Sequence, residues 1–177
     1  MQSMPAIYAT RHQRFGSYRL LILLGLLILG LDQASKLWIS AHLPFGTYGE
    51  PDAITVVPNL FYLVHVGNTG AAWSLFTGRS VLLASVAIAT LGAIFLWRNA
   101  LGLQHRTVQV SFGLLCGGIV GNLLDRLLHG HVIDFLDFHF GDYVYPTFNI
   151  ADSGICVGVV IYMWWSLRQP ANPSNTK

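Results

Sequence analysis

Long apolar segments constrain this 177-residue chain more than any other feature of its sequence. A helix needs about 20 mostly apolar residues to cross the roughly 30 Å hydrocarbon core of a bilayer. The chain offers four such segments, at 18–39, 80–97, 107–125 and 149–167. Only 10% of the residues are charged, against about a quarter in soluble domains. The sequence therefore predicts an all-α membrane protein, with four transmembrane helices in a single integral membrane domain.

The first apolar segment follows three arginines and so has the outline of a cleaved signal peptide. The segment continues, however, through Asp32 and Lys36 to about Ile39, without a clear cleavage site of small residues. We therefore interpret it as an uncleaved anchor that follows a short tail, 1–17.

Basic residues predict how the four segments are oriented. With four spans, both termini lie on the same side of the membrane. Of the ten Lys and Arg residues, seven fall on that side and three on the other, which predicts that the tails 1–17 and 168–177 are cytoplasmic. All eight acidic residues fall on the outer side or at the outer ends of the spans: Asp32, Glu50, Asp52, Asp125, Asp134, Asp137, Asp142 and Asp152. Any chemistry is therefore expected at the outer face.

Two segments join the spans on that outer side. The first, 41–79, contains two β-like runs, 54–57 and 60–66, separated by turn residues. It predicts a small extramembrane β-sheet region whose aromatic residues rest on the lipid surface. The second, 126–148, mixes apolar residues with His and Asp, and its periodicity does not decide between strand and helix.

Ionisable residues at membrane depth are costly, so each one is a functional candidate. Asp32 and Lys36 are four residues apart and can pair on one helical face, either to anchor the helix or to contact a substrate. Asp125 is best interpreted as a charged residue at a helix end, held in place by neighbouring residues. Arg126 suits a grip on a carbonyl or carboxylate, because its planar guanidinium offers several donors.

Asp134 and Asp152 are the leading candidates for catalysis, because the segment that joins them must return to the same membrane face. Two carboxylates brought close in a partly apolar site titrate as a unit, and one keeps its proton. Such a pair can take a proton from water and give one to a departing amide nitrogen. From the residues alone, two interfacial anchors or a helix N-cap at Asp152 would also explain the pattern.

A metal site is a rival interpretation of the second outer segment. His129, His131, Asp134, Asp137 and His139 are residue types that bind zinc or manganese. If the segment is extended, however, Asp134 points away from the face of His131 and Asp137, and the spacing matches no zinc signature. We therefore expect no metal. No phosphate-binding or dinucleotide-binding glycine loop is present, so we expect no cofactor, and a net charge of +2 gives no basis for nucleic acid binding.

Five segments, taken in order, carry a resemblance to a known family. They are 32–36 (DQASK), 68–74 (NTGAAWS), 117–126 (GGIVGNLLDR), 130–135 (GHVIDF) and 148–153 (FNIADS). Together they resemble the lipoprotein signal peptidases, also called signal peptidase II, of the bacterial inner membrane. The resemblance covers about residues 18 to 168.

The resemblance implies an intramembrane aspartic endopeptidase that removes signal peptides from diacylglyceryl-modified prolipoproteins, cutting just before the lipidated cysteine. It implies that Asp134 and Asp152 are the catalytic pair and that the outer face is periplasmic. Further positions that match the family motifs are the supporting or substrate-binding residues Asn68, Gly70, Asn122, Arg126 and Asn149, and the structural residues Asp32, Lys36 and Asp125. The implied partners are lipidated prolipoproteins, membrane lipids and the cyclic peptide globomycin, and a monomer is expected.

Two other classes of function compete with a peptidase. A small transporter or channel could use Asp32, Asp125 and Asp152 as a proton or cation path, but such a path requires acids near the middle of the membrane, and here every acid falls toward one end. A structural or assembly subunit would not need two individually indispensable aspartates.

Overall fold

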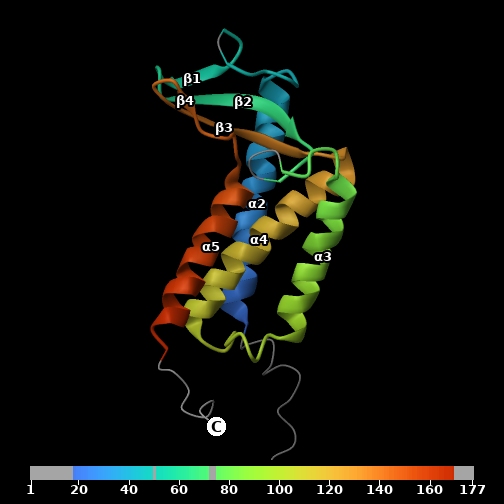
Figure 1. Ribbon diagram of the computed structural model, residues 1–177, viewed down its shortest axis with the longest axis vertical. Helices are drawn as coiled ribbons and strands as arrows, with labels where there is room; N and C mark the ends of the chain where they lie inside the picture. Colours follow the sequence, from blue (N-terminus) through green and yellow to red (C-terminus); the bar gives the residue numbers. More distant parts are fainter. Residues whose placement is uncertain (1–17, 50, 72–74, 170–177) are drawn as a thin grey trace, which may run out of the picture.

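The computed structural model describes residues 18–49, 51–71 and 75–169 of the chain. Within these residues, a bundle of helices carries a small β-sheet at one end (Figure 1). The expectations for the tails 1–17 and 170–177, for Glu50 and for 72–74 lie outside the described residues.

Four helices form the bundle: α2 (Arg19–His42), α3 (Ser80–Leu96), α4 (Arg106–His129) and α5 (Ile150–Leu167). Within the described part of the chain, α2, α4 and α5 are long and apolar enough to cross a membrane, whereas α3 is apolar but has only 17 residues. The prediction of a multi-pass membrane protein is confirmed, and the count of four spans stays a prediction.

The helices expose their apolar side chains and bury their polar ones. Val81 is 81% exposed and Leu167 is 83% exposed, whereas the buried residues of α2 are Asp32, Lys36 and Ile39. Such an arrangement would be unstable in water. It suits a bilayer, where the outward apolar side chains contact lipid.

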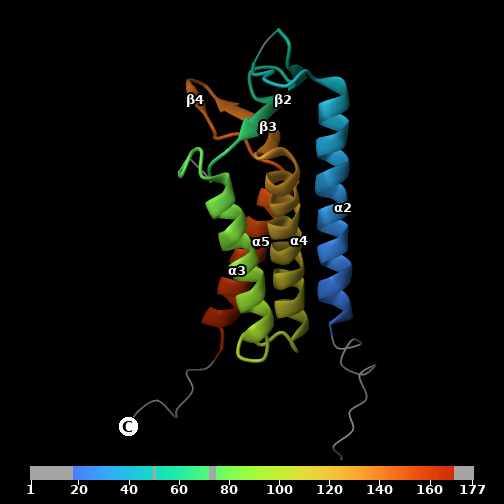
Figure 2. The same ribbon diagram turned by 90° about the vertical axis from the view of Figure 1, so that its right-hand side faces the viewer.

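Helix α4 lies between α2 and α5, and glycines on α4 allow this close approach (Figure 2). A Cβ atom at Gly117 would lie 2.6 Å from the carbonyl oxygen of Gly25 on α2, and one at Gly118 would collide with the carbonyl oxygen of Ala151 on α5. The bundle is therefore tightest where α4 meets the first turn of α5. Helix α4 continues to His129, beyond the predicted segment 107–125, and ends where Gly130 takes a left-handed conformation (φ 78°).

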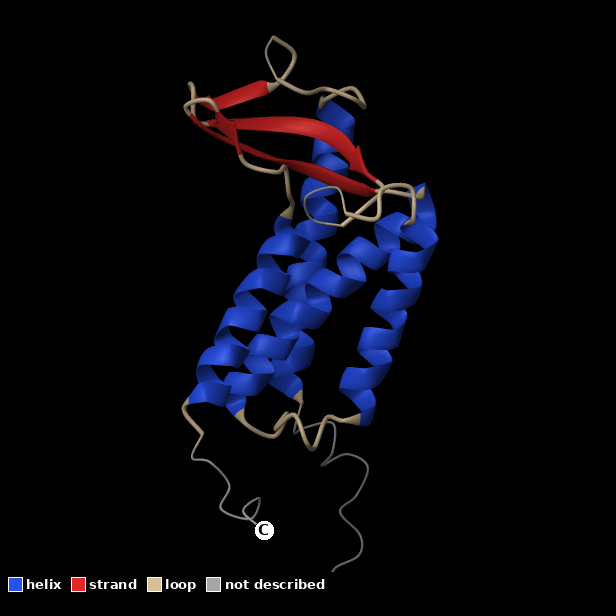
Figure 3. Cartoon of the chain, in the orientation of Figure 1, coloured by secondary structure: helices blue, strands red, loops and turns tan. Residues whose placement is uncertain are grey.

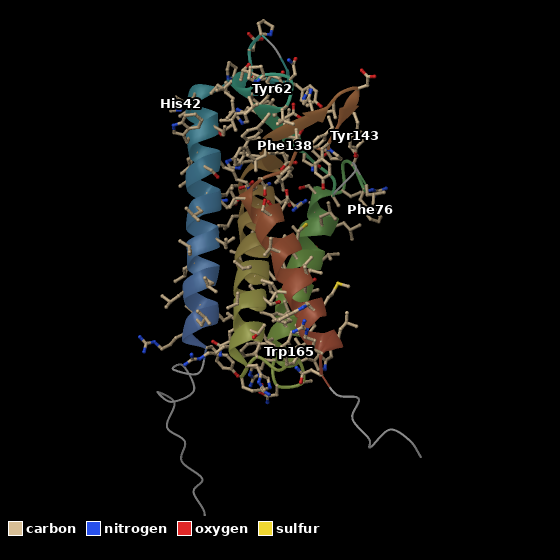
Figure 4. The ribbon with its side chains drawn as sticks, turned by 90° about the vertical axis from the view of Figure 1, so that its left-hand side faces the viewer. His42, Tyr62, Phe76, Phe138, Tyr143 and Trp165 are labelled. Carbon is tan, nitrogen blue, oxygen red and sulfur yellow. The ribbon has the colours of Figure 1, made fainter. Side chains whose placement is uncertain are left out.

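The sheet contains four antiparallel strands in the order β1 (Ile54–Val57), β2 (Phe61–Asn68), β3 (Val132–Phe140) and β4 (Tyr143–Val144). The predicted small sheet is thus confirmed. The segment 126–148, which periodicity left undecided, contains the end of α4 and the strands β3 and β4. The sheet lies across one end of the helices, and the described chain ends lie at the other (Figure 3). Tyr62, Phe138 and Tyr143 lie at the sheet end and Trp165 at the opposite end (Figure 4).

Candidate active site

Strand β3 holds Asp134 beneath the end of strand β2. In the register of these strands Asp134 is opposite Val66, so Asn68, two residues further along β2, is its diagonal neighbour on the same face. The Asn68 side-chain amide donates to Asp134 Oδ2 over 2.9 Å. Asp134 is 2% exposed, so this carboxyl group depends on protein partners rather than on bulk water.

Asp152 lies in the first turn of α5. The N-cap of that helix is Asn149, whose side-chain oxygen accepts from the Asp152 N–H (2.9 Å) while Asp152 Oδ2 accepts from the Asn149 N–H (3.2 Å). This reciprocal pattern is a capping box. The alternative of an N-cap at Asp152 is therefore wrong, because the N-cap is Asn149, three residues earlier. Asn122 of α4 donates to the other oxygen, Asp152 Oδ1, over 2.7 Å.

Asn149 links the two aspartates. Its backbone N–H donates to Asp152, and its side-chain Nδ2 donates to Asp134 Oδ1 over 2.7 Å. The same Nδ2 atom lies 3.2 Å from the Asn122 side-chain oxygen and 3.2 Å from the Ile133 carbonyl oxygen. Asn149 is fully buried. One rigid residue at the start of a helix therefore holds a carboxylate on either side of it.

The electrostatics of this arrangement favour a retained proton. The pKa of Asp134 is raised from 3.8 to about 7, first by burial and then by the nearby negative charge of Asp152. Hydrogen bonds from Asn68 and Asn149 and the positive charge of Lys36 act in the opposite direction. A carboxyl group that keeps its proton near neutral pH beside a second acid is chemically able to take part in proton transfer.

Arg126 connects the site to the segment that follows β2. Its Nη2 donates to the Gly70 carbonyl oxygen over 2.8 Å, and Nη1 donates to the Asn122 carbonyl oxygen over 3.3 Å. The Gly70 N–H in turn donates to the side chain of Asn68 over 2.9 Å. Among the described residues, the buried Arg126 Nε has no hydrogen-bond partner. The guanidinium therefore positions the chain next to Asp134, and its Nε–H group is left as a donor without an acceptor among the described residues.

Lys36 and Asp32 form the expected pair between residues four apart, at 2.8 Å, but the pair belongs to a larger buried cluster. The Lys36 ammonium also lies 2.8 Å from Asp125 and 3.1 Å from the side-chain oxygen of Asn122. Gln33, which the sequence did not single out, donates to both Asp32 and Asp125 over 3.1 Å each. Its position inside the 32–36 segment was the only signal available.

Comparison with known proteins fits this site geometry. Residues 24–168 match the family model described as signal peptidase (SPase) II. The chain belongs to the signal peptidase II family. The predicted resemblance is thus confirmed, and the chain is a peptidase.

Among signal peptidase II relatives, the lipoprotein signal peptidase of Azoarcus sp. (strain BH72) is 38% identical, with 93% of this chain and 92% of that protein covered. The lipoprotein signal peptidase of Oleidesulfovibrio alaskensis is 40% identical, with 77% and 86% covered. A bacterial membrane enzyme solved at 2.3 Å superposes with a TM-score of 0.76 at 29% identity, covering 89% of this chain and 93% of the other. The fold is therefore that of a membrane enzyme.

Three of the other residues considered as metal ligands in this signal peptidase II chain make contacts that do not involve Asp134. His139 contacts Asp137 at 2.7 Å, and Thr147 donates to the same buried carboxylate over 3.3 Å. His131 instead packs against the ring of Phe45. Within the described ranges, no three His, Cys, Asp or Glu side chains are grouped to hold a metal ion.

Proposed function

We propose that this chain is an aspartic endopeptidase that removes the signal peptide from diacylglyceryl-modified prolipoproteins, cutting just before the lipidated cysteine. One observation carries the proposal: Asn149 donates to Asp134 and to Asp152, so that a buried carboxyl group and a partly buried one lie on either side of one residue. The substrate class follows from the curated relatives, which are named lipoprotein signal peptidases.

The proposed reaction needs one proton on the pair. The ionised carboxylate takes a proton from a water molecule, which attacks the carbonyl carbon of the scissile bond, and the protonated carboxyl group gives its proton to the departing amide nitrogen. Asn68, Asn122 and Asn149 support this step, because each amide donates to one carboxylate oxygen and so limits its rotation. Arg126 and Gly70 keep the segment after β2 beside the pair, where a substrate backbone would pass.

We further propose that the chain lies in the bacterial inner membrane with four spans, both termini in the cytoplasm and the active site at the periplasmic interface. The seven-to-three distribution of basic residues supports this orientation. Both aspartates lie at the sheet end of the helices, at the level where a lipid-anchored precursor could reach them by lateral diffusion. Its acyl chains would stay in lipid while the peptide bond met the pair. The protein acts as a monomer and binds membrane lipids, and globomycin-like peptides inhibit it.

Conservative removal of either ionisable group tests this function. Asp134→Asn and Asp152→Asn should each lower the rate of cleavage of a lipidated precursor by at least about 100-fold, because the amide can neither accept nor deliver the proton. Asp142→Asn is the matched control, since this aspartate is exposed at the turn between β3 and β4. Release of the signal peptide is followed by gel shift, and protein abundance in the membrane is measured alongside. Full turnover by either site variant would refute the assignment.

A further inference from the structure

A buried ammonium group lies behind the aspartate pair without touching it. Lys36 is 2% exposed, and its Nζ lies 2.8 Å from Asp32 Oδ2, 2.8 Å from Asp125 Oδ2 and 3.1 Å from Asn122 Oδ1. An ammonium group has three N–H donors, and here each has one acceptor. The position and rotation of the Lys36 head group are therefore fully determined by its surroundings.

Two of these acceptors also hold the backbone beside the proposed catalytic residues. Asp32 Oδ1 accepts from the N–H of Ala151 over 2.9 Å, and Ala151 directly precedes Asp152. Asp125 Oδ2 accepts from the N–H of Ile133 over 3.1 Å, and Ile133 directly precedes Asp134. Both segments that carry an aspartate are thus tied to carboxylates that pair with Lys36.

The third acceptor sets the orientation of an amide. Because Lys36 donates to Asn122 Oδ1, the Nδ2 group of Asn122 points the other way and donates to Asp152 Oδ1 over 2.7 Å. The reversed amide would turn an oxygen toward the Asp152 carboxylate and an NH2 group toward the ammonium, and both contacts would be repulsive. Lys36 therefore excludes the orientation of Asn122 that would disturb the pair.

We propose that Lys36 is a positioning residue for the proteolysis proposed above: through Asn122, Asp32 and Asp125 it sets the orientation and spacing of Asp152 and Asp134. The inference rests on the proposed function. A role in stability alone is a weak account of this buried ion cluster, because well-packed apolar side chains can often replace such a cluster without loss of stability.

The test separates orientation from charge. Lys36→Met alone leaves two buried carboxylates without their cation, so the decisive variant is the double substitution Lys36→Met with Asp125→Asn. The double variant keeps the net charge of the cluster at minus one, and the oxygen of Asn at 125 can still accept from Ile133. It removes the group that orients Asn122.

We expect the purified double variant to insert into the membrane and unfold close to the parent temperature, with kcat for a lipidated precursor lowered about 10-fold to 100-fold and KM within about 2-fold. Its pH profile should move to higher pH, because the Lys36 ammonium lowers the pKa of Asp134 and the double variant lacks it. Asp32, Arg126 and Asp152 keep their charges, so kcat is compared at the pH optimum of each protein. In an Asn122→Ala background, the same double substitution should cost less activity than it does in the parent chain, since the lysine would already have lost one of the three groups through which it acts.

Arg168→Met is the matched control, because it removes an exposed cation at the opposite end of the bundle. If the parent and this control cleave but the double variant cleaves equally well, the positioning role of Lys36 is wrong. It is also wrong if neither Lys36 variant folds, since the lysine is then structural. A parent chain that leaves the lipidated precursor intact would instead refute the proposed function, so the two failures are distinguishable.

Discussion

At the residue scale, the buried carboxyl group of Asp134 should make stability depend on pH. The pKa of this group rises on folding from 3.8 to about 7, first because of burial and then because of Asp152. Folding therefore favours the protonated form. The resulting penalty is absent below about pH 4, where both states are protonated, and is complete above about pH 7, where both have lost the proton.

We predict that Asp134→Asn gains stability relative to the parent as pH rises from about 4 to 7, by on the order of a few kcal/mol in total. The amide cannot ionise and so escapes the penalty. Thermal unfolding of both proteins across this range measures the gain. The lost hydrogen bonds from Asn68 and Asn149 add an offset that does not vary with pH, so only the slope is interpreted. A constant difference from pH 4 to pH 8 would contradict the prediction.

The sequence could single out the aspartates but not what holds them. Asp134 and Asp152 lie in short motifs, and their residue type suggests proton transfer without any structure. That Asn149 bridges them, or that Lys36 contacts Asp125, follows from how helices and strands distant in sequence come together. Spacing along a single helix could predict the Asp32–Lys36 contact, because these residues are four apart and so lie on one helical face.

At the element scale, the distance between α4 and α5 depends on glycine. We predict that Gly118→Ala destabilises the protein by about 1–3 kcal/mol and slows cleavage, because its Cβ would collide with the carbonyl oxygen of Ala151, next to Asp152. Unfolding temperature and cleavage rate are measured on the same preparation.

Gly92→Ala on α3 is the control for this substitution, because nothing lies within 4 Å of a Cβ built there. Alanine is favoured over glycine inside a helix by roughly 0.5–1 kcal/mol, so this variant should be unchanged or more stable. Equal behaviour of the two variants would mean that the close approach of α4 and α5 does not limit stability or activity.

The elements themselves were predictable to different degrees. The apolar runs that form α2 and α4 could be predicted from their length, since so many consecutive, mostly apolar residues are typical of a membrane-spanning helix. Strand β3 could not be assigned, because it is buried on both faces over most of its length and so lacks the polar alternation of a half-exposed strand. Its pairing with β2 decides its conformation, and that pairing is a long-range contact.

At the scale of the whole molecule, apolar side chains face outward along the helices while the described charged residues at membrane depth are turned inward. Helix α3 is the shortest of the four helices, since 17 residues extend only about 25 Å. It also contributes least to the interior, with Ala84 as its one buried residue. A bilayer can thin slightly around a short helix, so its length does not prevent it from crossing.

We predict that α3 crosses the membrane with its start outside. In a chain whose Cys116 and Cys156 are replaced by alanine, single cysteines introduced as Arg79→Cys and Gln104→Cys would bracket α3, and both positions are exposed. A membrane-impermeant thiol reagent should label position 79 in spheroplasts and label position 104 only after the membrane is opened. Because the aspartate pair lies at the same end as residue 79, this result would also put the site on the outer face. Labelling of both positions from outside would mean that α3 does not span, and the reverse pattern would place the proposed site in the cytoplasm, where the basic residues predict it should not be.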